Sequence, residues 1–446
     1  MAENESWETQ DTKGYDSADD LLERLSEPHY QLNNETDRFL QDLDVAREVF
    51  ELLDPILQKQ AKEDREEFQK ILEGLQTQHN VNKGNRESWV ARARTLKKVL
   101  SRMTTGTKLF RRQSIASLVS RFDEFLSCVL RIALKNQPER LQGKNKCLPY
   151  EDALTADSID QLLSKIVAKE VGAIMRDSHE NQLVYIDDRF KLGLRDNFGK
   201  WSDLIEIMQR RNLFVHAGGV VSQKYLAKCR EMDITPEPSY EVGDLLSAEP
   251  EYYMNAFYAM YELGLRVGQG LFRRLFPEKL DEADQALNDT GFSLLTEERW
   301  RLAGIVFDFA LEFPSGWYSN DSWHKLFLVN RAIAYKESGK TKEMTDLLNG
   351  VDWSALAPRF RLAMLALRGQ FDAAEKVMKA VSEDEINKHA YRTWPVFRHF
   401  RNTKQFARAY QDLFNEEFQP TVSEEDLQEE TEPSTRDVLD ESNNGC

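Results

Sequence analysis

The sequence has few features that would tie it to a membrane or an oxidising compartment. No stretch approaches the ~20 apolar residues that a helix needs to cross a bilayer. The acidic start Met1–Ser6 differs from a secretory signal, which is basic and then apolar. The four cysteines are scattered without pairing or metal-binding spacing, which fits reduced thiols better than a disulfide framework. We therefore expect a cytoplasmic protein with no membrane partner.

Motifs for metals and nucleotides are also scarce. The seven histidines never approach cysteines or acids at zinc-binding spacing. Gly264, Gly268 and Gly270 follow no strand and fit no phosphate-binding motif. We therefore expect neither a metal nor a cofactor. Local context suggests no Ser-His-Asp triad, although residues far apart in the chain could still form one.

Positively charged residues are also outnumbered by negative ones, and the distribution of the net charge along the chain matters more than its total. The net charge is −17, of which residues 1–27 contribute −7 and residues 421–446 contribute −8. The body between these acidic ends is therefore nearly neutral, so the charge does not exclude an RNA-binding cleft. The basic run from Arg92 to Arg112 is the best candidate for contact with an RNA backbone, and a solvated helix face explains it equally well.

Apolar residues recur at helical spacing almost throughout, and no run shows the alternation of a strand, so the sequence predicts an all-α fold. Pro55 is expected to bend or break the first helical segment. The predicted organisation is a disordered acidic segment 1–30, a helical arm 31–100, a helical bundle 101–232, a proline-containing linker 233–250, a helical region 251–418 and a disordered acidic tail 419–446.

The helices of region 251–418 are predicted to pair as hairpins. The expected turns at Gly339, Gly369 and Asn402 are 30 and 33 residues apart. This spacing approximates the ~34-residue period of tetratricopeptide-type repeats. An ordinary helical bundle is the alternative.

The most chemically specific segment is Arg211-Asn212-Leu213-Phe214-Val215-His216, at the end of a helix predicted from Trp201 to His216 and stopped by Gly218-Gly219. Asn212 and His216 are four residues apart and share a helical face, and the long Arg211 side chain can reach the same side. A helix C-terminus favours a charged imidazole. Arg24 and His29 have the same spacing, but they lie in an acidic segment without an amphipathic helix, and we interpret that pair as chance.

These side chains suit RNA cleavage without a metal. A histidine can transfer the protons of the attacking 2′-hydroxyl and the leaving 5′-oxygen, and an arginine can hold the phosphate. One histidine does not easily serve as both base and acid. We therefore expect a homodimer whose two copies complete the site.

Residues 111–230 resemble the HEPN domains (higher eukaryotes and prokaryotes nucleotide-binding), whose signature is an arginine, a polar residue, three others and a histidine. The resemblance extends to Phe122-Asp123-Glu124-Phe125-Leu126, to Trp201 and Leu204, to the segment Arg210–Val221 and to Tyr225-Leu226. It implies a helical bundle that dimerises through the motif helices, with Arg211 and His216 catalytic and Asn212 the intervening polar residue.

The same resemblance implies a metal-independent endoribonuclease of the kind found in bacterial defence, abortive-infection and stress proteins. An active ribonuclease is toxic, so a restraint on its activity is expected, and the C-terminal helical repeats would bind a protein trigger or inhibitor. Some members of the family are catalytically silent. The alternative is therefore a non-catalytic adaptor that binds RNA or protein.

Overall fold

The computed structural model describes residues 26–77, 83–141, 156–234, 239–314, 316–353 and 357–419. These residues form helices joined by short turns, and their one β-type contact is an isolated bridge between Val220 and Leu245. The all-α prediction is confirmed. None of the described helices is long and apolar enough to cross a membrane.

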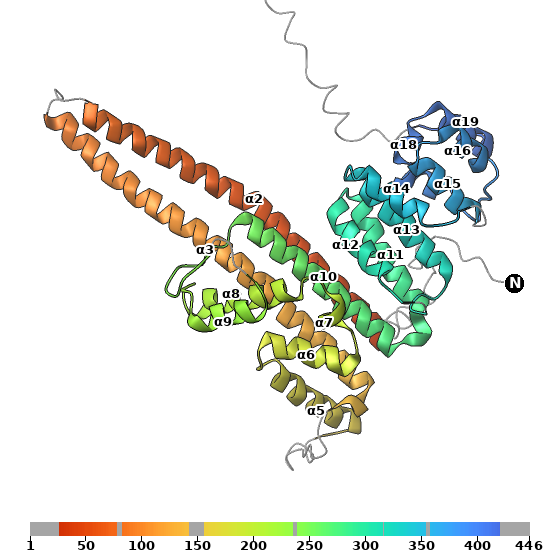
Figure 1. Cartoon of the computed structure of the whole chain (residues 1–446), viewed down its shortest axis with the longest axis horizontal. Coiled ribbons are helices and arrows are strands. Elements are labelled where there is room, and N and C mark those ends of the chain that lie inside the picture. The colour runs from red at the N-terminus through yellow and green to blue at the C-terminus, as the bar shows by residue number, and fades with distance from the viewer. Residues whose placement is uncertain are drawn as a thin grey trace, which may run out of the picture. The chain divides into compact units, whose positions relative to one another are not determined.

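Two long antiparallel helices, α2 (Pro28–Thr77) and α3 (Lys83–Asn136), dominate the first half of the chain (Figure 1). The predicted boundary between the helical arm 31–100 and the helical bundle 101–232 falls inside α3, which is one continuous helix. Pro55 removes one backbone hydrogen bond from α2, yet the helix continues through it. Next to this proline, Arg111 of α3 donates two hydrogen bonds to the Asp54 carboxylate and so ties α2 to α3.

A third long helix, α10 (Pro250–Leu275), packs along α2 and α3. Phe39 of α2 stacks on Phe125 of α3 with ring centroids 4.5 Å apart. Gly264 of α10 faces Phe39 so closely that an added Cβ would come within 2.2 Å of the ring, and Gly268 faces Thr36 in the same way. These glycines therefore allow two helices to pack closely, which gives them a structural role.

Shorter helices pack around these three. They are η2 (Pro138–Arg140), α5 (Ile159–Ile174), α6 (His179–Phe190), α7 (Leu194–Asn197), α8 (Trp201–His216) and α9 (Gln223–Glu231). The bounds of α8 agree with the helix predicted from the sequence. α5 packs on α3, whereas α8 packs on both α3 and α10.

The described residues divide into two compact units. The hairpin unit extends to Thr290 and includes Asp308–Trp323, and the C-terminal unit holds Gly291–Phe307 and the residues from His324 onward. The described part of the predicted linker 233–250 lies in the hairpin unit, and so does α10. The remaining helices are η3 (Pro277–Lys279), α11 (Leu280–Thr296), α12 (Trp300–Leu311), α13 (Asp321–Glu337), α14 (Thr341–Asn349), α15 (Pro358–Leu367), α16 (Phe371–Met378), α17 (Lys388–Thr393), η4 (Pro395–Phe397), α18 (Arg398–Arg401) and α19 (Lys404–Phe414).

Helices of the C-terminal unit follow one another in pairs with short turns. Gly339 ends α13 and Gly369 ends α15, both with positive φ, at 72° and 70°. The next amide returns to a carbonyl five residues earlier in each case, over 2.8 Å from Lys340 to Tyr335 and 2.9 Å from Gln370 to Leu365. Asn402 differs, with φ −82°. Two of the three predicted turns thus share one conformation, and the likeness to tetratricopeptide repeats stays a prediction.

The predicted disordered ends fall almost entirely outside the described residues, which begin at 26 and end at 419. The exception is the start of α2 at Pro28, inside the segment predicted to be disordered. His29 in its first turn is buried, with edge-on contacts to Phe272 and Phe276 of the hairpin unit. Packing against α10 thus orders residues whose own composition predicts no structure.

Candidate functional site

The predicted site residues lie at the C-terminal end of α8. The buried face of this helix includes Leu204, Ile205, Ile207 and Met208, which fixes it on the core. The helix ends because Gly218 and Gly219 both have positive φ, at 60° and 81°. The Gly219 amide then donates a 2.8 Å hydrogen bond to the Leu213 carbonyl.

Arg211 is turned toward α3 rather than toward solvent. Its side chain is 17% exposed, and Nη2 lies 3.6 Å from Oδ2 of Asp123. Nη1 donates a 3.2 Å hydrogen bond to Oδ1 of Asn212. The buried Nε has no hydrogen-bond partner among the described residues. The guanidinium is therefore oriented by two neighbours and keeps one donor unused.

Asp123 also contacts His179, in the first turn of α6, with 3.0 Å between its Oδ1 and the Nε2 of the histidine. Asp123, His179, Arg211 and Asn212 therefore form one polar cluster, called here the Asp123 cluster, in which three helices meet. Asp123 lies in the segment Phe122–Leu126, which the sequence analysis had singled out. Its contact with Arg211 and the part played by His179 were missed from the sequence, because the three helices are far apart along the chain.

His216 stands apart from the Asp123 cluster. Its side chain is exposed at the last turn of α8, and within the described residues it has no hydrogen-bond or ion-pair partner. Asn212 lies one turn earlier on the same face and is hydrogen-bonded to Arg211. The motif thus presents a guanidinium held in place and an imidazole open to solvent, with an amide between them.

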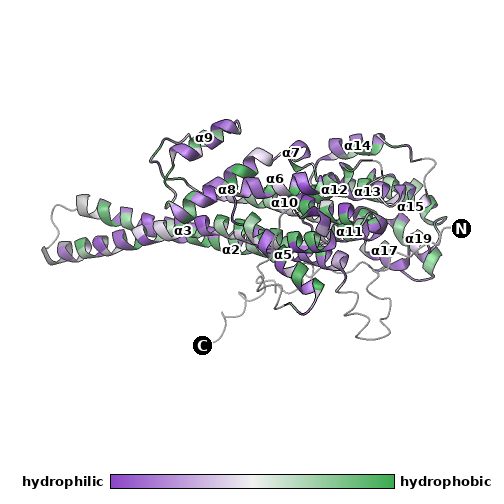
Figure 2. Ribbon diagram, turned by 90° about the horizontal axis from the view of Figure 1, so that it is seen from below, coloured by the Kyte–Doolittle hydropathy of each residue, from purple (hydrophilic) through white to green (hydrophobic). Residues whose placement is uncertain are grey.

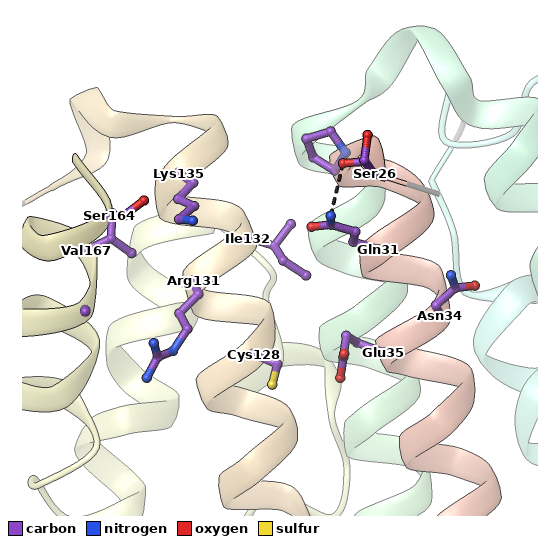
Figure 3. Close-up of a pocket in the computed structure, with 12 residues that line it drawn as sticks. Ser26, Gln31, Asn34, Glu35, Cys128, Arg131, Ile132, Lys135, Ser164 and Val167 are labelled. Atoms are coloured by element: carbon purple, nitrogen blue, oxygen red, sulfur yellow. Dashed lines mark hydrogen bonds between the residues drawn. The ribbon is translucent and has the colours of Figure 1, made fainter. Parts of the chain in front are cut away.

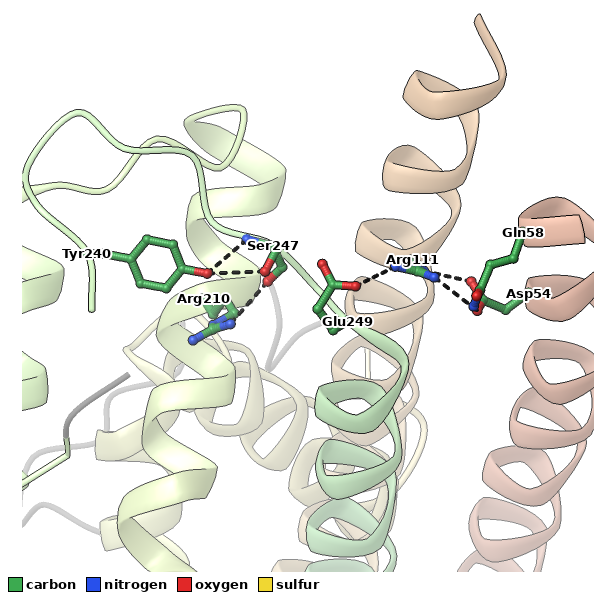
Figure 4. A network of polar contacts seen from close by, with 7 residues as sticks. All are labelled: Asp54, Gln58, Arg111, Arg210, Tyr240, Ser247 and Glu249. Atoms are coloured by element: carbon green, nitrogen blue, oxygen red, sulfur yellow. Dashed lines mark hydrogen bonds and ion pairs between the residues drawn. The ribbon is translucent and has the colours of Figure 1, made fainter. Parts of the chain in front are cut away.

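A buried charge network lies behind the motif. Glu206 accepts a 2.7 Å hydrogen bond from Nε of Arg210, and its two oxygens also accept from the hydroxyls of Tyr225 and Tyr252. Arg210 stacks on the Tyr252 ring at 4.0 Å. It also donates to the Ser247 carbonyl over 3.0 Å (Figure 4). Burial, reinforced by the Glu206 charge, raises the pKa of Tyr225, so its hydroxyl stays a donor at neutral pH.

This network was also missed from the sequence. The Glu206–Arg210 spacing of four residues is a recognisable signal for an ion pair on one helix. Its other members lie on α9, on α10 and in the loop between them. The network fixes α8 to that loop and so helps to set the position of the motif.

Arg112 of α3 holds the chain just after the motif. Nη1 donates over 2.8 Å to the Gly218 carbonyl and Nη2 over 2.9 Å to the Leu246 carbonyl. The same guanidinium lies 5.3 Å from the centre of the Phe214 ring. Because these contacts occupy both terminal nitrogens, Arg112 acts as a brace for the end of α8.

Arg111 is likewise occupied, by Asp54 and by Glu249 over 2.7 Å (Figure 4). The C-terminal end of the predicted basic run is thus committed to contacts within the protein. The side chains of Arg94, Lys97, Lys98, Arg102 and Lys108 have no ion-pair partner among the described residues. RNA contact by these five residues stays a prediction.

A separate pocket of about 640 Å³ lies between α2, α3 and α5 (Figure 3). Arg131 and Lys135 line one wall, and Glu35 lies across from them with Cys128 nearby. Burial raises the pKa of the Cys128 thiol, so it stays protonated at neutral pH. No residue of α8 lines this pocket.

Among the described residues, no group of three or more histidine, cysteine, aspartate or glutamate side chains is placed to hold a metal ion. Cys128 and Cys229 are free thiols. Comparison with known proteins finds no matching family model, curated protein or solved structure.

Proposed function

We propose that this protein is a metal-independent endoribonuclease whose site combines Arg211, Asn212 and His216 with the same residues of a second copy. The observation that carries the proposal is the contrast within the motif. Arg211 is held by Asp123 and Asn212, whereas His216, five residues on, is exposed and has no partner in the part of the chain that the structure describes.

In the proposed reaction the ribose 2′-hydroxyl loses a proton and its oxygen attacks the adjacent phosphorus. The bond from phosphorus to the 5′-oxygen breaks, that oxygen takes up a proton, and a 2′,3′-cyclic phosphate remains. His216 of one copy accepts the first proton and His216 of the other donates the second. No oxidant, metal or water is consumed in this step.

Arg211 would bind the phosphate oxygens, whose negative charge increases in the transition state. Its contact with Asp123 is long at 3.6 Å, so a phosphate can displace it at modest cost. Asp123 then keeps the side chain oriented in the absence of RNA. His179 is a poor second proton carrier, because its side chain is only 11% exposed and its Nε2 already contacts Asp123. This favours a histidine from a second copy.

The test compares the purified full chain with His216→Ala and His389→Ala on structured and unstructured RNA in EDTA. His389 is also exposed, in the C-terminal unit, and controls for loss of a surface histidine. We expect cleavage by wild type and His389→Ala, with 2′,3′-cyclic phosphate ends, and a loss of at least about 100-fold in His216→Ala.

Cleavage that survives His216→Ala would exclude the proposed site. No cleavage by wild type, together with binding of RNA or protein, would favour the adaptor. Expression in bacteria adds a second measurement, since a nuclease with a role in defence should slow growth as wild type and not as His216→Ala. Deleting residues 421–446 tests whether the acidic tail restrains the activity. A protein trigger or inhibitor would bind the paired helices of the C-terminal unit.

A further inference from the structure

The outer face of α2 carries eight residues spaced alternately four and three apart: Arg38, Asp42, Val45, Val49, Leu52, Ile56, Lys59 and Glu63, called here the α2 stripe. This is the spacing of the positions that face a partner helix in a coiled coil. Lys59 and Glu63 are exposed, and the other six side chains are each at least 40% exposed. The stripe therefore has the pattern of a contact surface, and none of the described residues covers it.

The four central residues of the α2 stripe are apolar and largely exposed to solvent. Val45 is 58% exposed, Val49 46%, Leu52 65% and Ile56 56%. A continuous apolar row of this kind is costly in water and marks an interaction surface. Leu53, 38% exposed, widens the row on one side.

The charged residues at the two ends of the stripe make it self-complementary. When two copies of α2 pair antiparallel about a two-fold axis between Val49 and Leu52, each Val49 faces Leu52 and each Val45 faces Ile56 of the other copy. Further out, each Asp42 faces Lys59. At the ends, each Arg38 faces Glu63. All four kinds of pair are favourable, and symmetry forms each of them twice.

Other arrangements are disfavoured by the same residues. In a parallel pair every charged position would face its own copy, Arg38 against Arg38 and Glu63 against Glu63. An antiparallel pair shifted by one heptad would place Val45 against Glu63 and Val49 against Lys59. Only the symmetric antiparallel register combines apolar contacts with opposite charges.

The present partners of these charges do not block the arrangement. Arg38 contacts Glu35 at 2.6 Å, and Asp42 lies 3.4 Å from Arg121. Both are surface pairs, which contribute little and rearrange easily. Lys59 and Glu63 have no ion-pair partner among the described residues.

We propose that the α2 stripe is a self-association surface, on which a second copy of the chain binds antiparallel about a two-fold axis. The stripe covers 26 residues of α2, or about 38 Å of helix. α8 packs on α3 and α10, on the side away from α2 in both views (Figures 1 and 2). This interface is therefore distinct from the motif face and does not depend on the proposed ribonuclease activity.

The first experiment measures the mass of the full chain by sedimentation velocity, from nanomolar to several hundred micromolar protein. Wild type should dimerise reversibly. Leu52→Glu places a carboxylate in the apolar row twice per dimer, and should raise the dissociation constant about 100-fold or more. Ile159→Glu is the matched control, because Ile159 is 82% exposed on α5, outside the stripe. It should leave the dissociation constant unchanged.

The second experiment tests the register by exchanging charges. Arg38→Glu and Glu63→Arg should each weaken self-association on the order of tenfold, since like charges then face each other twice. A mixture of the two variants should form a heterodimer near wild-type affinity, because both end pairs are again opposite in charge. Circular dichroism confirms that each variant keeps its helix content.

A wild-type chain that stays monomeric at every concentration overturns the proposal. So does self-association that Leu52→Glu leaves unchanged, and self-association lost in that variant but not restored by mixing overturns the antiparallel register. A dimer through the motif face, which the proposed ribonuclease needs, would not respond to Leu52→Glu or to the charge exchange, so the changes in mass among these variants report the α2 stripe alone.

Discussion

The long hairpin has two halves built from the same two helices and stabilised in different ways. The packed half, residues 28–54 of α2 with 115–136 of α3, buries a row of large apolar side chains that includes Leu32, Phe39, Phe50, Phe122 and Leu126. The free half, residues 55–77 and 83–114, extends beyond α10 (Figures 1 and 2). None of its described side chains, at 55–74 and 87–114, is buried.

Exposed polar contacts take the place of a core in the free half. Hydrogen bonds one turn apart, such as Gln60 to Asp64 at 3.1 Å, each stabilise a helix by only a few tenths of a kcal/mol. The ion pair between Arg92 of α3 and Glu67 of α2 is exposed and contributes ~0–1 kcal/mol. Helix length is therefore a poor guide to where the folding free energy resides.

The largest difference should come from deleting an aromatic ring in each half. Phe39→Ala removes a buried ring stacked on Phe125 and should lower the free energy of unfolding by about 3–5 kcal/mol. Trp89→Ala removes a larger ring from the free half, where Trp89 is 37% exposed, and should cost about 1 kcal/mol or less. Urea unfolding followed by circular dichroism measures both. Similar losses would show that the free half has its own stabilising core.

The second comparison uses two ion pairs of the same chemistry. Glu206→Gln leaves Arg210 buried without its counter-charge, and should cost about 3 kcal/mol. Glu67→Gln breaks the Arg92 pair, in which both side chains are more than 40% exposed, and should cost ~0–1 kcal/mol. Melting curves at two salt concentrations check this, since salt should weaken the Arg92 pair more than the buried one.

The third prediction concerns the Asp37 carboxyl group of the packed half, whose ionised form is disfavoured by burial. Burial and the nearby Asp289 charge raise the pKa of Asp37 to about 6, although Thr290 donates a hydrogen bond that lowers it. When folding raises the pKa of an acid, the free energy of unfolding of the protein falls as that acid ionises. For Asp37 this fall is expected between about pH 4 and pH 6.

Asp37→Asn should therefore stabilise the protein by roughly 1–3 kcal/mol at pH 7 and by little at pH 4. Asp64→Asn in the free half should change stability by no more than ~0.5 kcal/mol at either pH. Unfolding measured at several pH values gives the answer. A gain from Asp37→Asn that does not depend on pH would show that titration of this carboxyl is not the cause.

The smallest predicted effect compares two glycine-to-alanine substitutions that should change the free energy of unfolding in opposite directions. Gly268→Ala would place a methyl group 2.2 Å from the Thr36 side chain, and should cost about 1 kcal/mol through strain between α10 and α2. Gly106 lies in the free half of α3 with nothing within 4 Å of an added Cβ. Gly106→Ala should therefore stabilise by about 0.5–1 kcal/mol through helix propensity. Thermal melts compare the two, and a shift of the same sign in both would contradict the packing difference.

The parts of the fold that were predictable are those with a local signal. Apolar spacing from Leu204 to Met208 and the glycines at 218 and 219 located α8 correctly. The free half of α3 lacks a buried face, so its apolar periodicity is weak, and the predicted boundary between arm and bundle at residue 100 falls inside this one helix. The start of α2 was missed because His29 is ordered by Phe272 and Phe276, some 240 residues away in the chain.

The same division applies to the candidate site. Arg211, Asn212 and His216 could be selected from their spacing and from the helix end beside them. Their surroundings could not, because the contact of Arg211 with Asp123 depends on how α3 packs against α8. The three hydrogen bonds that Glu206 accepts depend equally on residues from α8, α9 and α10. Sequence spacing identifies candidate groups, and packing decides which of them meet.

The contacts of Arg112 make α3 a mechanical link between distant parts of the hairpin unit. α3 has 54 residues and is about 80 Å long. Its free end projects into solvent, and Arg112, a little past its middle, grips the carbonyl of Gly218. A molecule that bound and displaced the free end would tilt α3 about its packed half. Through the hydrogen bond from Arg112, this displacement would reach the backbone at Gly218, two residues beyond His216.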